Sequence, residues 1–205
     1  MENLEKEETT GAGTSSPLKT KIKKRFETKR IAFMAIFVAL SYAVSFIEIP
    51  LFPAAPFLKL DFGNVFILLV GFLLGPIEGV IVCALKESLR MLSSSSGGVG
   101  ELANMLVTSS YILLPSVAYR FRKGLKTVIP ALVAACCVGT AVALLANRYI
   151  NFPLYEAFLG MSAQEAFGML WGVILAFNLI KTLSVSILTI FLYKRLSNFL
   201  KKMKF

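Results

Sequence analysis

The chain alternates long apolar runs with short polar or basic segments. Apolar residues dominate six stretches, at about 31–47, 63–74, 77–92, 101–119, 128–146 and 167–193. Runs of about 20 apolar residues are typical of helices that cross the hydrocarbon core of a bilayer. The second stretch is short and turns through Gly75-Pro76 into the third. The pattern therefore predicts an all-α integral membrane protein, a bundle of six transmembrane helices.

Basic residues gather beside the apolar runs. Of the 22 Lys and Arg residues, 17 lie in residues 1–30, 120–126 and 194–205. An excess of Lys and Arg marks the cytoplasmic side of a membrane protein, and an even number of spans puts both termini on one side. We expect both termini in the cytoplasm. The same distribution accounts for the net charge of +10, so we expect no nucleic-acid partner.

These signals divide the chain into three parts. We expect a polar and basic cytoplasmic tail over residues 1–30, a membrane domain over 31–193 and a basic cytoplasmic tail over 194–205. The composition of the N-terminal tail indicates a disordered segment that runs into a basic juxtamembrane segment or interfacial helix. Because no small-residue cleavage site follows the first apolar run, we expect that span to remain uncleaved.

Three loops are expected on the outer side, over residues 48–62, 93–100 and 147–165. The first contains Pro50, Pro53 and Pro56, which predict a stiff, extended segment because proline has a fixed φ and no N–H donor. The first and third loops contain aromatic and proline residues, whereas the second consists mainly of serine and glycine. We expect them to pack over the outer mouth of the bundle.

The residue types present argue against an enzyme or a metal site. The chain has no histidine, which removes histidine-based catalytic triads and zinc-protease motifs. Cys83, Cys136 and Cys137 all fall inside apolar runs without metal-ligand spacing, so we expect them to be small core residues. No paired aspartate motif and no nucleophile–base set is evident. We expect no catalytic residues, no metal and no enzymatic activity.

Polar side chains inside the last two apolar runs are the strongest signal of a binding site. Lys181 lies three residues after Asn178, so both project from one helix face, and Asn147 closes the fifth run. A charge at that depth is costly and usually faces a protein interior or a cavity. Two interpretations stay open. The residues form either a hydrogen-bonded polar cluster between helices, with Glu87 or Glu101 as counter-charge, or a site for an elongated polar ligand.

A glycine turn over residues 98–100 opens the fourth apolar run. Such a turn exposes backbone N–H groups at a helix N-terminus, and Glu101 lies in the favoured first turn. Either this is helix capping, or these donors and Glu101 also hold a polar ligand. Lys86, Glu87 and Arg90 in the third run are interpreted as mainly structural, with a Glu87–Arg90 pair three residues apart, and a role in ligand binding or coupling is the alternative.

Small residues recur every four positions in the first apolar run, at Ala35, Ala39 and Ala43. This spacing lets a second helix approach closely. The stripe serves either packing within the bundle or docking onto a separate membrane subunit.

Four segments occur in a familiar order: Pro56-Phe-Leu-Lys-Leu-Asp-Phe62, Gly71-Phe-Leu-Leu-Gly-Pro76, Gly98-Val-Gly-Glu-Leu-Ala-Asn104 and Asn147-Arg-Tyr-Ile-Asn-Phe-Pro-Leu-Tyr155. Over about residues 28–200 the chain resembles the riboflavin-specific substrate-binding components (S-components) of energy-coupling factor (ECF) vitamin transporters. The first and third segments are the most specific part of this resemblance.

The resemblance implies a multi-pass protein of the prokaryotic plasma membrane that captures riboflavin with high affinity from outside. It implies an ECF transmembrane coupling subunit and two cytoplasmic ATPases as partners, and toppling of the S-component in the bilayer to release the vitamin. Riboflavin is then a transported substrate, and no cofactor is expected. An S-component for another vitamin, such as thiamine or biotin, and a solitary small-molecule carrier remain the alternatives.

The resemblance also implies which residues bind. The polar ligand residues carried over are Glu101, Asn104, Asn147, Asn178 and Lys181, with Gly98, Val99 and Gly100 beside them. Amides and an ammonium suit the carbonyls and imide of the flavin, and a carboxylate suits its ribityl hydroxyls. Phe57, Leu60 and Tyr149 are expected to form walls for the flat ring. Ala35, Ala39 and Ala43 are expected to contact the coupling subunit.

Overall fold

The computed structural model describes residues 17–94 and 97–200, so the first part of the expected N-terminal tail (1–16) and the end of the expected C-terminal tail (201–205) lie outside the described part. In chain order the elements are α1 (Pro17–Val44), β1 (Glu48–Pro50), β2 (Lys59–Asp61), α2 (Gly63–Leu73), α3 (Pro76–Met91), α4 (Val99–Phe121), α5 (Leu125–Ala146), the π-helix η1 (Asn147–Asn151), α6 (Phe152–Leu159) and α7 (Ala163–Leu200). The predicted helical class is therefore confirmed.

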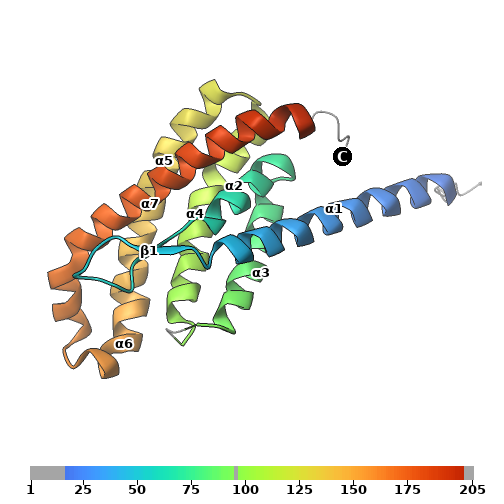
Figure 1. The fold of residues 1–205 in the computed structure, drawn as a ribbon. Helices are drawn as coiled ribbons and strands as arrows, with labels where there is room; N and C mark the ends of the chain where they lie inside the picture. Colours follow the sequence, from blue (N-terminus) through green and yellow to red (C-terminus); the bar gives the residue numbers. More distant parts are fainter. Residues whose placement is uncertain (1–16, 95–96, 201–205) are drawn as a thin grey trace, which may run out of the picture.

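The helices α1 to α5 and α7 pack into one bundle, and α2 lies at its centre (Figure 1). Helix α2 contacts α1, α3, α4 and α7, and nearly all of its apolar side chains are buried. The main core gathers around Ile67, Leu68, Val82 and Ile112, which are fully buried. The first half of α1 projects beyond the bundle, and its N-terminal end lies on the same side of the picture as the C-terminal end of α7.

Glycine allows α2 and α3 to lie in close contact. A Cβ atom on Gly79 would lie 3.2 Å from the Cα of Gly71 in the neighbouring helix. The two helices are joined by Gly75, whose φ of 132° is accessible mainly to glycine, and Pro76 then begins α3. The turn that the sequence predicts at Gly75-Pro76 is confirmed.

The first outer loop forms a two-stranded antiparallel hairpin between β1 and β2. Ile49 pairs with Leu60, and Pro50 with Lys59. The tip of this hairpin packs on one end of the bundle, where Ala55 and Leu58 join a second apolar cluster with Phe152 and Phe177. The expected extended segment is confirmed, and its two short strands are the departure from a purely helical fold.

The third outer loop is mostly helical, so its prediction as a loop is wrong. Helix α5 continues through η1 into α6, and Gly160, with a φ of 67°, ends this long helical stretch. Ser162 and Glu165 then begin α7 with a reciprocal cap: the Ser162 N–H donates to the Glu165 carboxylate at 3.1 Å, and the Glu165 N–H donates to the Ser162 hydroxyl at 3.3 Å.

Three helical segments in the described part of the chain are long and apolar enough to cross a membrane: Val99–Phe121, Lys126–Glu156 and Ala163–Arg195. Helix α2 is apolar but shorter, with 11 residues. The 28-residue α1 combines a basic first half with an apolar second half and passes residue 30 without a break.

Candidate functional site

A cavity of about 390 Å³ lies beneath the hairpin, between α3, α4, α7 and the junction of α5 with η1. Its wall carries equal numbers of acidic and basic side chains: Glu48, Asp61, Glu87 and Glu101, with Lys59, Lys86, Arg90 and Lys181. The formal charge of the wall is therefore zero. A cavity of this size and balance suits an uncharged small molecule that carries many hydrogen-bonding groups.

The fold brings most of the sequence-predicted site residues together. The cavity is lined by Phe57, Gly100, Glu101, Asn104, Asn147, Asn178 and Lys181. They come from the hairpin, α4, η1 and α7, four parts of the chain that are distant in sequence. The convergence of these side chains on one cavity favours a ligand site over separate packing roles.

Four predicted site residues do not line the cavity. Gly98 adopts a left-handed conformation at the start of α4, and its N–H donates to the Ser94 hydroxyl at 3.1 Å. Val99 lies beside it, and Leu60 is buried within the hairpin. The Tyr149 side chain is 66% exposed, with the Arg148 guanidinium 5.5 Å from its ring centroid.

A buried polar chain connects Lys181 to the hairpin. The Lys181 ammonium donates to Asn104 Oδ1, and Asn104 Nδ2 donates to Glu87 Oε1 at 2.5 Å. The same Glu87 oxygen accepts from Lys86 Nζ at 2.7 Å, and Lys86 also pairs with Asp61 of β2. The expected pair between Glu87 and Arg90 is wrong, because each side chain has a partner on a different element.

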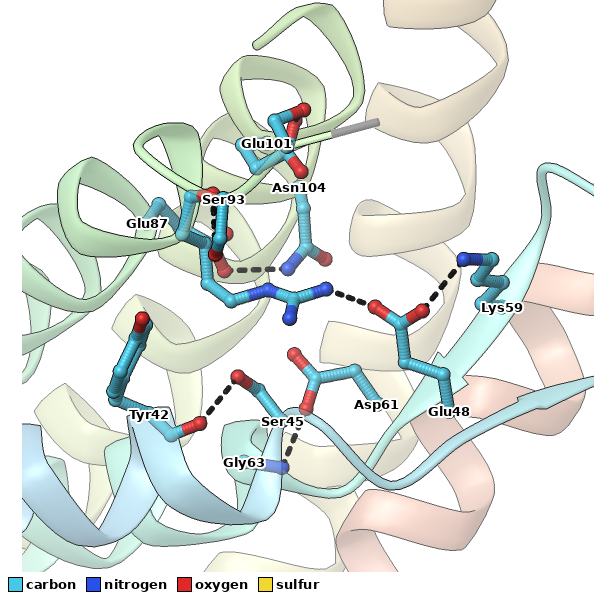
Figure 2. Close-up of polar contacts among 12 residues, drawn as sticks. Tyr42, Ser45, Glu48, Lys59, Asp61, Gly63, Glu87, Ser93, Glu101 and Asn104 are labelled. Atoms are coloured by element: carbon cyan, nitrogen blue, oxygen red, sulfur yellow. Dashed lines mark hydrogen bonds and ion pairs between the residues drawn. The ribbon is translucent and has the colours of Figure 1, made fainter. Parts of the chain in front are cut away.

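Arg90 instead ties α3 to the hairpin. Its guanidinium pairs with Glu48 of β1, which also accepts from Lys59 Nζ of β2 at 2.6 Å. Figure 2 shows Glu48, Lys59 and Asp61 on the hairpin, facing Glu87 and Asn104 on the helices. Two ion pairs thus fasten the hairpin to α3, one at each of its strands.

The asparagines on the other walls are held by their own helices. Asn147 Nδ2 donates to the Ala143 carbonyl at 2.8 Å, and Asn178 Nδ2 donates to the Ile174 carbonyl at 2.8 Å. Asn151 Nδ2 donates to Asn147 Oδ1 at 3.0 Å. The π-helical turn brings the amides of Asn147 and Asn151 into one hydrogen-bonded pair on the wall. Such turns recur at functional sites in other proteins.

Sequence reasoning missed several lining residues. Asp61 belongs to the quoted Pro56–Phe62 segment, and Asn151 follows Asn147 by four residues, but neither was assigned to the site. Phe177, which also lines the cavity, precedes Asn178 directly. The sequence favours a structural role for Lys86 and Glu87 over a ligand role, but both side chains line the cavity. The available signal was two adjacent charges inside an apolar helix, which are costly unless they face partners.

Other residues singled out by sequence also have definite positions. Cys83 and Cys136 are buried as expected, whereas Cys137 is exposed. Ala35, Ala39 and Ala43 are exposed on α1, so packing inside this bundle does not account for the stripe. Within residues 17–94 and 97–200, no group of three or more Cys, Asp or Glu side chains is arranged to hold a metal ion.

A polar cavity under a hairpin, in a bundle whose helices include three that are long and apolar enough to cross a membrane, is typical of a membrane protein that binds a small molecule. Residues 29–193 match the family model described as "ECF transporter, substrate-specific component". The chain therefore belongs to the substrate-specific components of ECF transporters, and the family resemblance predicted from sequence is confirmed.

Individual relatives agree with this family. The chain is 34% identical over 178 residues to the riboflavin transporter RibU of Staphylococcus aureus (strain TCH60), covering 86% of this chain and 94% of the relative. It is 23% identical to the riboflavin transporter FmnP of Bacillus subtilis (strain 168), covering 87% and 97%. A solved structure of the S component of a bacterial ECF transporter superposes with a TM-score of 0.75 at 35% identity, covering 85% of this chain and 99% of that one.

Proposed function

We propose that this chain is the riboflavin-binding S-component of an ECF-type vitamin uptake transporter. It captures riboflavin on the outer side of the prokaryotic plasma membrane and delivers it inward with ATP-driven partner subunits. One observation carries the proposal: Glu101, Asn104, Asn147, Asn178 and Lys181 converge on one cavity in a chain that is 34% identical to a riboflavin transporter.

The chemistry of the cavity wall matches riboflavin. The vitamin is uncharged, and the acidic and basic side chains of the wall balance. Its flavin carbonyls and imide pair with amides and an ammonium, and its ribityl hydroxyls pair with a carboxylate. Phe57 and Phe177 supply aromatic surface for the flat ring. A site with many fixed hydrogen-bond partners rejects analogues that leave those partners unpaired.

The proposal includes six membrane spans, with α1, α2 and α3 crossing beside the three longer helices and both termini in the cytoplasm. The partners are a transmembrane coupling subunit and two cytoplasmic ATPases. The exposed stripe of Ala35, Ala39 and Ala43 on α1 is the docking surface for the coupling subunit, because small exposed residues allow close helix approach. The chain itself binds and carries riboflavin and performs no chemical reaction.

Purified full-length protein tests the proposal directly. Protein from a flavin-containing host is expected to be yellow, and the ligand-free protein is expected to quench the fluorescence of added riboflavin. Competition with thiamine and biotin separates riboflavin from other vitamins. Colourless protein that fails to quench riboflavin would overturn the assignment, and uptake into vesicles by this chain alone without ATP would indicate a solitary carrier.

A further inference from the structure

Two neighbouring charges on α3 are almost completely buried. The side chains of Lys86 and Glu87 are 1% and 2% exposed, in a helix whose other buried positions are apolar or small. Isolated charges at such positions are strongly unfavourable unless they are paired and fully hydrogen-bonded. The contacts of these two charges therefore indicate what they do.

The hydrogen bonds of Glu87 and Lys181 fix the orientation of the Asn104 side-chain amide. Asn104 Nδ2 donates to Glu87, and Asn104 Oδ1 accepts from the Lys181 ammonium. The Thr108 hydroxyl also donates to the same oxygen, at 3.4 Å. If the amide rotated by half a turn, its NH₂ group would face the ammonium and its oxygen would face the carboxylate. Glu87 and Lys181 together therefore allow one orientation of Asn104.

The same network also determines which negative charge lies near Lys181. Among the ion pairs of the described residues, none includes Lys181, although its side chain is buried. The nearest negative charge in its hydrogen-bonded chain is Glu87, reached through Asn104. Glu87 is itself shared with Lys86, which also pairs with Asp61. The chain from Asp61 to Lys181 thus contains two negative and two positive charges.

We infer that Glu87 is the counter-charge of Lys181, with the Asn104 amide bridging the two by hydrogen bonds. Glu87 and Lys86 are then positioning residues of the binding site. A carboxylate in direct contact would hold the ammonium in a strong ion pair. An amide oxygen is a weaker partner, so the Lys181 ammonium keeps N–H groups for an acceptor in the cavity. The assignment of that acceptor to riboflavin rests on the proposed function.

Exchanging the carboxylate and the amide tests this inference. Glu87→Gln leaves two cations against Asp61 alone, and Asn104→Asp puts two carboxylates in contact. In the double variant Glu87→Gln/Asn104→Asp, the new amide at position 87 accepts from Lys86 and donates to the new carboxylate at position 104. That carboxylate in turn accepts from Lys181. The total charge is then that of the native chain, and the hydrogen bond between positions 87 and 104 is kept with its direction reversed.

Each single variant is expected to lower riboflavin affinity by about tenfold or more. The double variant is expected to bind at least about threefold more tightly than the weaker-binding single variant, because it restores the charge balance of one coupled network. It is expected to bind less tightly than the native chain, because the carboxylate at position 104 then pairs directly with Lys181. Fluorescence quenching of the full chain measures affinity. Glu78→Gln on the same helix is the matched control: Glu78 pairs with Arg30 away from the cavity, so native affinity is expected.

Unchanged affinity in Glu87→Gln, or a double variant no better than the weaker single, would overturn the inference. If neither single variant can be purified, a double variant that folds and binds riboflavin would support the inference. If none of the three variants can be purified, the inference is overturned. Melting temperatures of the ligand-free variants measure the same coupling without ligand. Failure of the native chain to bind riboflavin would therefore reject the proposed function. The melting temperatures of the ligand-free single and double variants would still test whether positions 87 and 104 are coupled.

Discussion

At the scale of single residues, the helix face of Lys181 could be predicted from the sequence, but its hydrogen-bond partner could not. Helical spacing predicts that Asn178 and Lys181 share a face, and both line the cavity. The partner of Lys181 was not predictable, because Asn104 lies 77 residues earlier in the chain. The Lys86–Asp61 pair likewise joins α3 to the hairpin across 25 residues. Periodicity places a side chain on a face, whereas the tertiary fold selects what it meets.

Lys181→Ala and Asn147→Ala are expected to weaken riboflavin binding while the fold stays intact. Lys181→Ala removes the ammonium, and Asn147→Ala removes the acceptor that holds the Asn151 amide. Loss of a hydrogen bond that involves a charged group corresponds to about 1.5–3 kcal/mol, or roughly tenfold to a hundredfold in affinity for the lysine variant. Fluorescence titration measures the affinity, and thermal melting monitors the fold.

Lys126→Ala is the matched control for the lysine, because Lys126 is exposed at the start of α5 and does not line the cavity. Native affinity in both Lys181→Ala and Asn147→Ala would assign these residues to a structural polar cluster instead.

At the scale of elements, hydropathy located the helices well and failed where a helix continued through polar sequence. Residues 147–153 contain an arginine, two asparagines and a proline, a composition that favours a loop. The chain instead stays helical through η1, and Pro153 falls in the first turn of α6, where its missing N–H is tolerated. A π turn breaks the 3.6-residue repeat, so a search for that repeat cannot detect it.

The hairpin supports an element-scale prediction about release. Arg90 pairs with Glu48 and so fastens β1 to α3. Arg90→Gln keeps most of the side-chain volume but removes this ion pair, so the hairpin should open more readily over the cavity. We expect riboflavin to dissociate about three- to tenfold faster, as fits the modest energy of a partly exposed pair. A stopped-flow chase with excess unlabelled ligand measures the rate.

Arg148→Gln is a suitable control, because Arg148 is stacked on Tyr149 and Phe167 and does not line the cavity. A native dissociation rate in Arg90→Gln would mean that apolar packing of the hairpin tip alone holds it closed.

The contact between α1 and α2 gives a prediction about stability. A Cβ atom on Gly63 would lie 2.4 Å from the backbone oxygen of Ser41, which cannot move without shifting α1. Gly63→Ala is therefore expected to lower stability by about 1–3 kcal/mol, as overpacked core substitutions do. Gly168→Ala on α7 meets nothing within 4 Å and is the control, expected to be neutral or slightly stabilising. Equal melting temperatures for the two variants would contradict this close contact.

At the scale of the whole molecule, the surface outside the cavity is strongly apolar around the bundle. Exposed side chains include Ile36 and Leu40 on α1, Val133 on α5 and Ile187 on α7, which suits a chain surrounded by lipid. Such a surface agrees with the six apolar runs of the sequence and with a composition of 56% hydrophobic residues in a chain of 205. Which part of that surface meets a protein partner depends on side-chain size, and the exposed face of α1 carries a regular stripe of alanines.

Ala39→Leu tests that stripe in the assembled transporter. A leucine at the centre of the stripe would keep a partner helix from approaching closely, so co-purification with the coupling subunit and ATPases should fall at least about tenfold. Riboflavin affinity should stay within about twofold of native, because Ala39 does not line the cavity. Ala134→Leu makes the same change at an exposed position of α5 and should assemble normally. Normal assembly of Ala39→Leu would make the stripe lipid-facing surface, whereas loss of riboflavin binding would place Ala39 in the supporting core of the site.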